Sequence, residues 1–288
     1  MAKRKCGGVR AMNQKYLSFA CGSLAFVWQA LFFYVPLLFV LVTGFSGETW
    51  DAGFLPFLNH TYFKILARSV VMALGTSLAC LCIGYPLAYF IAFRAGKMRD
   101  LLLFLVMLPF WTNFLLHICA WFFVLDYNGF FNQFLLHWGI ISAPLHVLNT
   151  YWAIGLVMVY FYLPFMILPL YATLDRFDKK LLEASLDLGA TWRQTVMHVL
   201  IPLTLSGIRV GFLLVCIPAF GEFVIPYFMG GDRTMFAGSV ISHFVLKIES
   251  GIEGAAFTLL SSLVLIVLAG TVYSLLGYFI PRSLEERL

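Results

Sequence analysis

Charge is the scarcest property of this sequence. Only 11% of its 288 residues are Asp, Glu, Lys or Arg, whereas 61% are hydrophobic. A soluble domain of this size needs a charged surface, so the composition indicates a membrane protein. The net charge of +5 is small, and the positions of the basic residues say more than their number.

Sequence motifs of enzyme chemistry are also missing. The chain has no G-x-x-x-x-G-K-[ST] phosphate loop, no H-E-x-x-H zinc motif and no G-x-S-x-G nucleophile motif. Its six His residues lack metal-ligand spacing, and most of its six Cys residues fall in hydrophobic runs, where a thiol behaves as a small hydrophobic group. We therefore predict a transport or channel protein with no catalytic residue, metal site, disulfide framework or nucleic-acid partner.

Six hydrophobic runs approach or exceed the roughly 20 residues that a helix needs to cross a bilayer. They cover residues 19–44, 69–93, 101–125, 150–174, 203–230 and 254–281. The first follows the basic tail "MAKRKCGGVRAMNQK", is longer than the apolar part of a secretory signal, and has no clear small-residue cleavage site after it. We interpret it as a retained membrane span rather than a cleaved signal.

The Lys and Arg residues predict the orientation of these spans. With the N-terminus in the cytoplasm, 14 of the 19 basic residues fall on the cytoplasmic side, four fall outside, and Arg209 lies within a span. Basic residues are retained on the cytoplasmic side, so we expect both termini and the segment 175–202 to be cytoplasmic.

Segment 175–202 is predicted to form two short helices joined by a tight bend. Asp178 can cap the first helix, and Gly189 stands where a left-handed residue ends it. Thr191 and Gln194 have capping-box spacing at the start of the second helix. Pro202 cannot continue that helix, so we expect it to open the next span at a new angle.

Each of these two helices carries an apolar face. The first face consists of Leu181, Ala184, Ser185 and Leu188, and the second of Trp192, Val196, Val199 and Leu200. The helical pattern alone is compatible with an amphipathic linker on the membrane surface or with a docking surface for a soluble partner.

The order of residues in this segment resembles the "EAA" loop of ABC importer permeases. Glu183-Ala184-Ser185-x-x-x-Gly189 is followed, at the family's spacing, by Ile201-Pro202, with Ser185 in place of the second Ala. The resemblance implies that the loop docks in a cleft of the ATP-hydrolysing subunit and couples its closure to opening of the membrane path. The implied coupling residues are Glu183, Ala184, Ser185, Gly189, Ala190 and Pro202.

Longer stretches are similar to the spermidine/putrescine branch of these permeases, and to the first of its two permeases. They are "GYPLAYFIA" (84–92), "LPFWTNFLL" (108–116), "LPFMILPLYATLD" (163–175), "LLEASLDLGA" (181–190) and "IPAFGEFVIPYFMGG" (217–231). The chain departs from the family at His117, where relatives often carry Arg, and at "ESGIEGAA" (249–256).

The resemblance implies an all-α membrane protein with six transmembrane helices and the importer-permease (MetI-like) fold in the bacterial inner membrane. Its implied partners are a cytoplasmic ATPase dimer, a second permease, an external substrate-binding protein and membrane lipid. No cofactor is expected in this chain, because ATP-Mg binds the ATPase. We divide the chain into a basic tail (1–16), a first span with its outer loop (17–68), a core (69–281) containing the coupling loop 175–202, and a second tail (282–288).

A path for a polyamine needs negative groups for its ammonium charges and aromatic faces for its methylenes. Glu222 is the only carboxylate in the six runs, and it could attract a cation or serve as a structural hydrogen-bonding group. Trp111, Tyr160 and Tyr162 could line the path, or could instead pack or face lipid. Asp126 could contribute to a negative outer rim. Two alternatives stay open. The chain could be an ABC importer permease for another solute, such as an anion, iron or another organic cation, or it could be a stand-alone secondary transporter.

Overall fold

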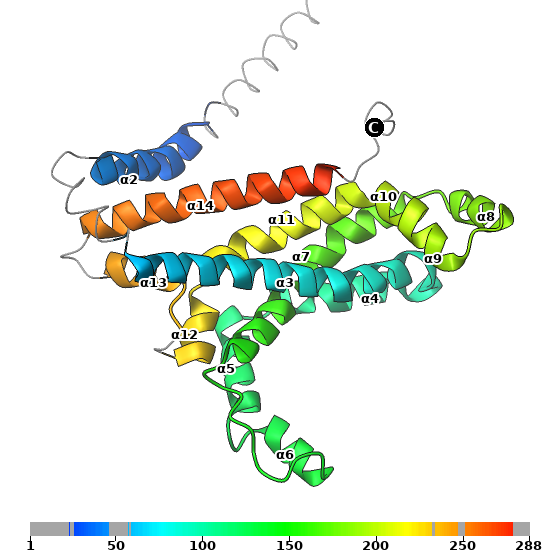
Figure 1. Ribbon diagram of the computed structural model, residues 1–288, viewed down its shortest axis with the longest axis horizontal. Helices are drawn as coiled ribbons and strands as arrows, with labels where there is room; N and C mark the ends of the chain where they lie inside the picture. The colour runs from blue at the N-terminus through cyan, green and yellow to red at the C-terminus, as the bar shows by residue number, and fades with distance from the viewer. Residues whose placement is uncertain are drawn as a thin grey trace, which may run out of the picture.

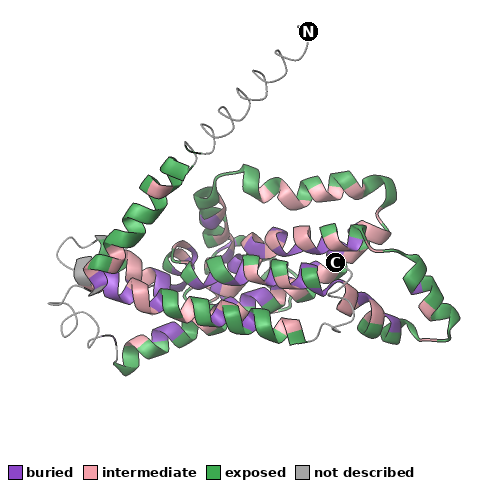
Figure 2. Ribbon diagram, turned by 90° about the horizontal axis from the view of Figure 1, so that it is seen from above, coloured by how far each residue is buried: buried purple, intermediate pink, exposed green. Residues whose placement is uncertain are grey.

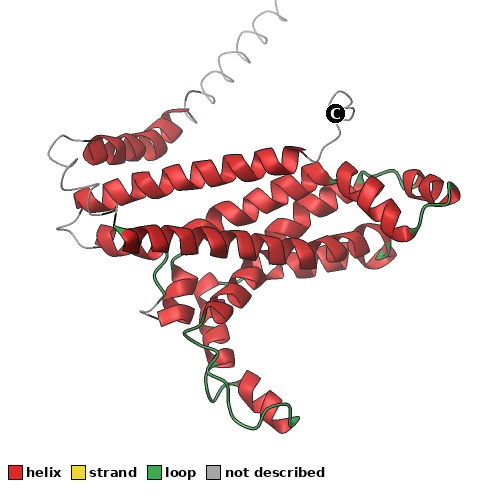
Figure 3. Ribbon diagram, in the orientation of Figure 1, coloured by secondary structure: helices red, strands yellow, loops and turns green. Residues whose placement is uncertain are grey.

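The computed structural model describes residues 23, 26–45, 57, 59–231, 234–246 and 251–278. Every regular element within these residues is a helix (Figures 1 and 3). In chain order the helices are η1 (Ala30–Tyr34), α2 (Val35–Phe45), α3 (His60–Phe93), η4 (Gly96–Met98), α4 (Arg99–Met107), η5 (Leu108–Trp111), α5 (Phe114–Leu125), α6 (Phe130–His137), α7 (Tyr151–Asp175), α8 (Lys180–Asp187), α9 (Trp192–Thr195), η6 (Val196–Leu200), α10 (Ile201–Leu203), α11 (Leu205–Gly221), α12 (Val224–Gly230), α13 (Ala237–Leu246) and α14 (Gly251–Tyr278).

Five helices of the described chain are long and apolar enough to cross a membrane. They cover 26–44, 60–93, 114–137, 151–175 and 253–278, and the bent pair 192–203 with 205–221 raises the number to six if it is counted as one span. The all-helical prediction is confirmed, whereas the arrangement of six spans with cytoplasmic termini stays a prediction. Both predicted tails, 1–16 and 282–288, lie outside the described residues.

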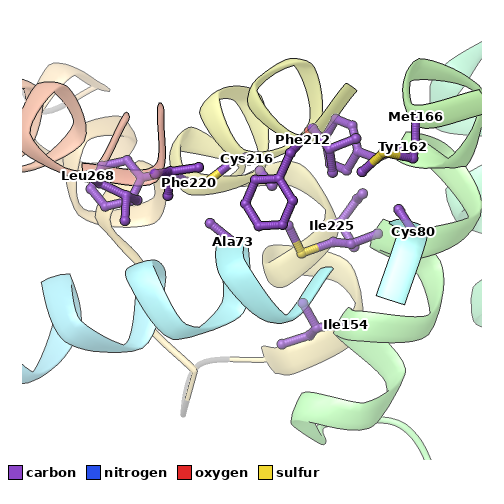
Figure 4. Close-up of a cluster of buried hydrophobic side chains, with 14 of the residues drawn as sticks. Ala73, Cys80, Ile154, Tyr162, Met166, Phe212, Cys216, Phe220, Ile225 and Leu268 are labelled. Carbon is purple, nitrogen blue, oxygen red and sulfur yellow. The ribbon is translucent and has the colours of Figure 1, made fainter. Parts of the chain in front are cut away.

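Three helices, α3, α7 and α11, pack side by side to form the centre of the molecule (Figure 1). The face that α3 buries carries mostly small residues at helical spacing: Ser69, Ala73, Thr76, Ser77, Cys80, Gly84 and Ala88. Small side chains let helix backbones approach closely, which is how helices associate in lipid. Larger side chains of α7 and α11, such as Met166 and Phe212, fill the space between the three helices (Figure 4).

Two glycines of α11 lie close to α7. A Cβ atom on Gly207 would lie 2.9 Å from the carbonyl oxygen of Pro169, and one on Gly211 would lie 2.9 Å from the Met166 sulfur. Real Cβ atoms are not found at such distances from a backbone atom, so a larger residue at position 207 would push α11 away from α7.

Two of the six predicted runs are interrupted. The third, expected to be a single span over 101–125, consists of α4, the short η5 that contains Pro109, and α5. Between η5 and α5 the chain is extended, and the Asn113 side chain caps α5 by accepting hydrogen bonds from the N–H groups of Leu115 (2.9 Å) and Leu116 (3.4 Å). The fifth run is divided at Glu222, between α11 and α12.

The first span and α6 lie apart from the central bundle, whereas α5 contacts the bundle at α7 (Figure 1). Residues 26–44 contact α14 and are mostly exposed, as Figure 2 shows in green. Only Ile118 and Leu125 are buried among the 12 residues of α5. These segments therefore present apolar side chains that the described part of the chain does not cover.

Candidate functional site

The two-helix segment predicted around Gly189 has the expected shape. The Asp178 carboxylate accepts a hydrogen bond from the N–H of Lys180 (3.0 Å) at the start of α8. Gly189 ends this helix in the left-handed region, with a φ of +84°. Thr191 and Gln194 then form the predicted capping box, in which each side chain bonds the other residue's backbone N–H. All three local predictions are confirmed.

A hydrogen bond between side chains holds the two short helices together. The hydroxyl of Ser185 on α8 lies 2.9 Å from that of Thr195 on α9, and Thr195 is fully buried. Position 185 is where this chain departs from the family's second Ala. Only the fold shows that the hydroxyl added by this replacement has a partner.

The prediction for Pro202 is wrong, because the helix continues through it. The η6 segment is a π-helix in which the N–H of Ile201 donates to the carbonyl of Val196, five residues back. This wider turn accommodates the proline ring, which an ordinary α-helix does not. The change of direction comes at Thr204, where the axes of 192–203 and 205–221 differ by 68°.

Thr204 holds this bend in place. Its hydroxyl donates to the carbonyl of Leu200 (2.8 Å) and lies 3.0 Å from the phenol oxygen of Tyr85 on α3, which is therefore the donor in that second bond. The bend thus links the end of the two-helix segment to the central bundle.

The predicted apolar face of α8 is turned outward. Leu182 is the one residue of this helix that is buried, whereas Leu181 is 46% exposed and Leu188, at its end, is 89% exposed. Glu183 and Ala184 are exposed on the same helix. On the second helix, Val196, Val199 and Leu200 pack inward as expected, while the half-exposed ring of Trp192 lies 6.0 Å from that of Tyr89. We call Leu181, Glu183, Ala184, Leu188 and Trp192 the exposed loop face.

The other end of this segment is joined to α7 and α4. Arg99 at the start of α4 forms an ion pair with Asp175 at the end of α7 (2.9 Å), and its guanidinium lies 4.9 Å from the centre of the Tyr171 ring. Both charged groups are partly exposed, so the pair contributes at most about 1 kcal/mol to stability. Neither residue carries a motif that predicts this contact.

Glu222 occupies the break between α11 and α12, and the chain itself engages both of its carboxylate oxygens. Oε1 accepts hydrogen bonds from the N–H groups of Phe223 (3.1 Å) and Val224 (3.0 Å), which begin α12. The phenol of Tyr162 on α7 donates to Oε2 (2.7 Å). The structure therefore brings together two of the predicted path residues, Glu222 and Tyr162, in a contact that joins two helices.

Tyr160 takes part in a separate polar group. Its phenol lies 3.1 Å from Nδ1 of His117, and Nε2 of His117 contacts the hydroxyl of Thr112. The centres of the Tyr160 and Trp121 rings are 5.4 Å apart. His117 was noted in the sequence only as a departure from the family, and here it connects the "WTN" stretch to α7.

The two remaining path residues lie elsewhere. Trp111 is 71% exposed and packs edge-on against Phe104, and Asp126 ends α5, where its carbonyl accepts a hydrogen bond from the N–H of Gly129 (2.8 Å). A large cavity, of about 1120 Å³, lies against α3 and α7 and is lined by none of the five predicted path residues. Their role in transport stays a prediction.

Comparison with known protein families identifies the class of protein to which this chain belongs. The family described as "Binding-protein-dependent transport system inner membrane component" matches residues 84–285, which include the whole two-helix segment and the Glu222 break. The chain belongs to this family. Its predicted role as the permease subunit of an ABC importer in the bacterial inner membrane is thereby confirmed, and it is a transport subunit rather than an enzyme.

Two curated relatives are similar over most of the chain. The spermidine/putrescine transport system permease protein PotB of Escherichia coli (strain K12) is 41% identical over 248 residues, covering 83% of this chain and 90% of the relative. The protein of the same name from Haemophilus influenzae is 38% identical over 249 residues, covering 83% and 87%. The resemblance to the spermidine/putrescine permease family is confirmed.

A solved structure shows the same fold at low sequence identity. A bacterial ABC transporter involved in the import of the acidic polysaccharide alginate superimposes with a TM-score of 0.72, at 14% identity, over 93% of this chain and 98% of that chain. The importer-permease (MetI-like) fold predicted from the sequence is therefore confirmed.

Proposed function

We propose that this permease takes up polyamines, spermidine and putrescine, as the first permease of its importer. The similarity to PotB supports this cargo, because it runs through the predicted path stretches and both interrupted runs instead of being confined to the loop that all importer permeases share. In the proposed orientation both termini and the loop 175–202 are cytoplasmic, as the distribution of Lys and Arg predicts.

We propose that the exposed loop face docks on an ATPase dimer. Apolar side chains with an acid among them, held on two short capped helices, make a stiff surface that its own chain leaves uncovered. A displacement of this surface would be transmitted to α11 through the bend at Thr204 and to α3 through Tyr85. ATP-Mg binds the ATPase and not this chain.

We propose a second permease and an external binding protein as the other partners. The little-buried α5 supports the first of these, because an apolar helix that its own chain does not cover needs either lipid or another subunit against it. The binding protein is supported by the family itself and by a related structure, in which an alginate transporter is in complex with a periplasmic protein that carries an alginate pentasaccharide.

We propose that Glu222 attracts the cationic substrate along the path while it holds α12 in place. The Tyr162 phenol and two backbone N–H groups donate to this half-buried carboxylate, and no salt bridge joins it to a basic side chain in the described chain. Tyr160, Trp111 and Asp126 would supply aromatic and negative groups along the same route.

Uptake of labelled substrate tests the cargo. A strain that lacks other polyamine transporters, and expresses this permease with its partner subunits, should accumulate labelled spermidine and putrescine and should lose uptake when the permease carries Glu183→Lys. Competition with unlabelled amines, anions and iron chelates measures selectivity. An assembled complex that hydrolyses ATP in response to another solute and takes up neither polyamine would contradict the proposed cargo and leave the permease assignment intact.

A further inference from the structure

The cavity against α3 and α7 is a groove with an apolar floor. Four residues of α3 at intervals of one turn, Ala67, Val71, Gly75 and Ala79, line it together with Gly155 and Val159 of α7. A Cβ atom on Gly75 would meet no other atom within 4 Å, so the groove is open space at its centre. Its volume of about 1120 Å³ is large enough for a long apolar chain.

Two basic residues stand at one end of this groove. Lys64 and Arg68, one helical turn apart on α3, line it and are exposed. No ion pair or hydrogen bond joins either side chain to the rest of the described chain, where the one salt bridge is that between Arg99 and Asp175. Two cations that have no acidic partner in the described chain lie beside an apolar groove, and together they make a surface complementary to an anionic amphiphile.

The length of α3 places these cations at a membrane border. Its 34 residues span about 51 Å, whereas the hydrocarbon core is about 30 Å thick, so each end projects by roughly two turns. Arg68 lies about two turns from the helix start and directly precedes the apolar run that begins at residue 69. Tyr151 and Trp152, at the start of α7, line the same end of the groove with the aromatic side chains typical of the interface.

We propose that the groove between α3 and α7 binds an anionic phospholipid. Lys64 and Arg68 contact the phosphate of the headgroup, and one acyl chain lies along Gly75, Ala79 and Gly155. An acyl chain needs no hydrogen bonds, which suits this floor, and the headgroup supplies the negative charge that the described chain does not. A helix of the second permease is the other occupant to be tested, since it too could fill a groove lined by small residues.

The position of Trp152 provides a direct probe. Its side chain is 86% exposed and lines the cationic end of the groove, so a lipid bound there would lie within contact distance of the indole. Brominated acyl chains quench tryptophan fluorescence on contact. The assembled transporter would be reconstituted in mixtures of phosphatidylcholine and phosphatidylglycerol in which one of the two lipids is brominated, and Trp152→Phe isolates the signal of this residue from those of the other tryptophans.

Brominated phosphatidylglycerol is expected to quench Trp152 at much lower mole fraction than brominated phosphatidylcholine. Each basic residue near an anionic lipid contributes about fivefold in affinity, so Lys64→Gln and Arg68→Gln together should remove a preference of about 25-fold. Arg94→Gln with Lys97→Gln is the matched control, because these two cations lie beyond the other end of α3 and do not line the groove. Gly75→Leu, which narrows the groove, should weaken quenching by both lipids.

Two outcomes would overturn the proposal. Equal quenching of Trp152 by the two brominated lipids would show that no anionic headgroup is selected. A Trp152 signal that neither lipid quenches, in a complex whose second permease cross-links to position 75, would show that a protein helix occupies the groove. Thr76→Val distinguishes the two occupants further. The buried Thr76 hydroxyl lines the groove and has no hydrogen-bond partner in the described chain. A helix of the second permease could supply such a partner, whereas an acyl chain could not.

Discussion

The chain bends at the start of helix α11, at Thr204, and breaks at its end, at Glu222. Different kinds of hydrogen bond hold these two joints. At its start, Thr204 is held by neutral groups, a hydroxyl on a carbonyl and the phenol of Tyr85. At its far end, the charged carboxylate of Glu222 satisfies the first N–H groups of α12 and accepts from Tyr162. An ionised acceptor makes hydrogen bonds worth about 1.5–3 kcal/mol, against about 1 kcal/mol for a neutral one.

This difference suggests separate tasks for the two joints. The joint at Thr204 adjoins the exposed loop face and needs to yield when that face moves, so weak neutral bonds suit it. The joint at Glu222 lies within a predicted span, where an unpaired backbone group has no water to bond. A charged cap keeps that break in one geometry while the first joint changes.

The largest effect is expected at the exposed loop face. Glu183→Lys should leave membrane insertion intact and reduce substrate-stimulated ATP hydrolysis to its basal rate, because it reverses the charge of the docking surface. Asp187→Lys makes the same charge change at an exposed position at the end of α8 and serves as the control. Normal coupling in Glu183→Lys would remove the docking assignment.

At the joint formed by Glu222, Glu222→Gln should reduce polyamine uptake by about tenfold or more, since it removes the charge and a charge-assisted bond worth about 1.5–3 kcal/mol. The amide oxygen can still cap α12, so assembly of the complex should fall much less. Uptake and the yield of assembled complex are measured on the same membranes. Equal losses of both would leave Glu222 with a structural role alone.

The bend of the two-helix segment should be sensitive to Gly189→Val. A side chain in the left-handed region costs about 1–2 kcal/mol, and a β-branched one is the least tolerated there. We expect a lower thermal stability of the complex and reduced uptake. Gly221→Ala, at the last residue of α11, adds a methyl group with nothing within 4 Å of it and should be nearly silent. Full uptake by Gly189→Val would contradict the bent-helix geometry.

The smallest effect is expected at the joint formed by Thr204. Tyr85→Phe removes one neutral hydrogen bond to Thr204 and should cost about 1 kcal/mol. In this variant the ATPase activity of the assembled complex should lose part of its response to substrate. Tyr162→Phe, which removes the hydrogen bond to Glu222, should have the larger effect on stability. The reverse order of the two phenol variants would mean that the joints are not held as their contacts indicate.

Local features of the candidate site were predictable because their causes lie within a few residues. The cap at Asp178, the left-handed Gly189 and the Thr191–Gln194 box each depend on neighbours along the chain, and each is present. The break at Asn113 also has a local signal, a proline followed by a capping residue, but the continuous apolar run concealed it.

The sequence by itself determined that this chain is a helical membrane protein, that the loop 175–202 contains two capped helices, and that it belongs with importer permeases. Composition, capping and motif spacing are properties of short stretches. Only the tertiary structure decided that Pro202 stays in its helix while the chain bends at Thr204, that Tyr162 reaches Glu222 across 60 positions, and that Leu181 and Leu188 face outward while Leu182 is buried. Those outcomes depend on which helices pack together, and no local pattern carries that information.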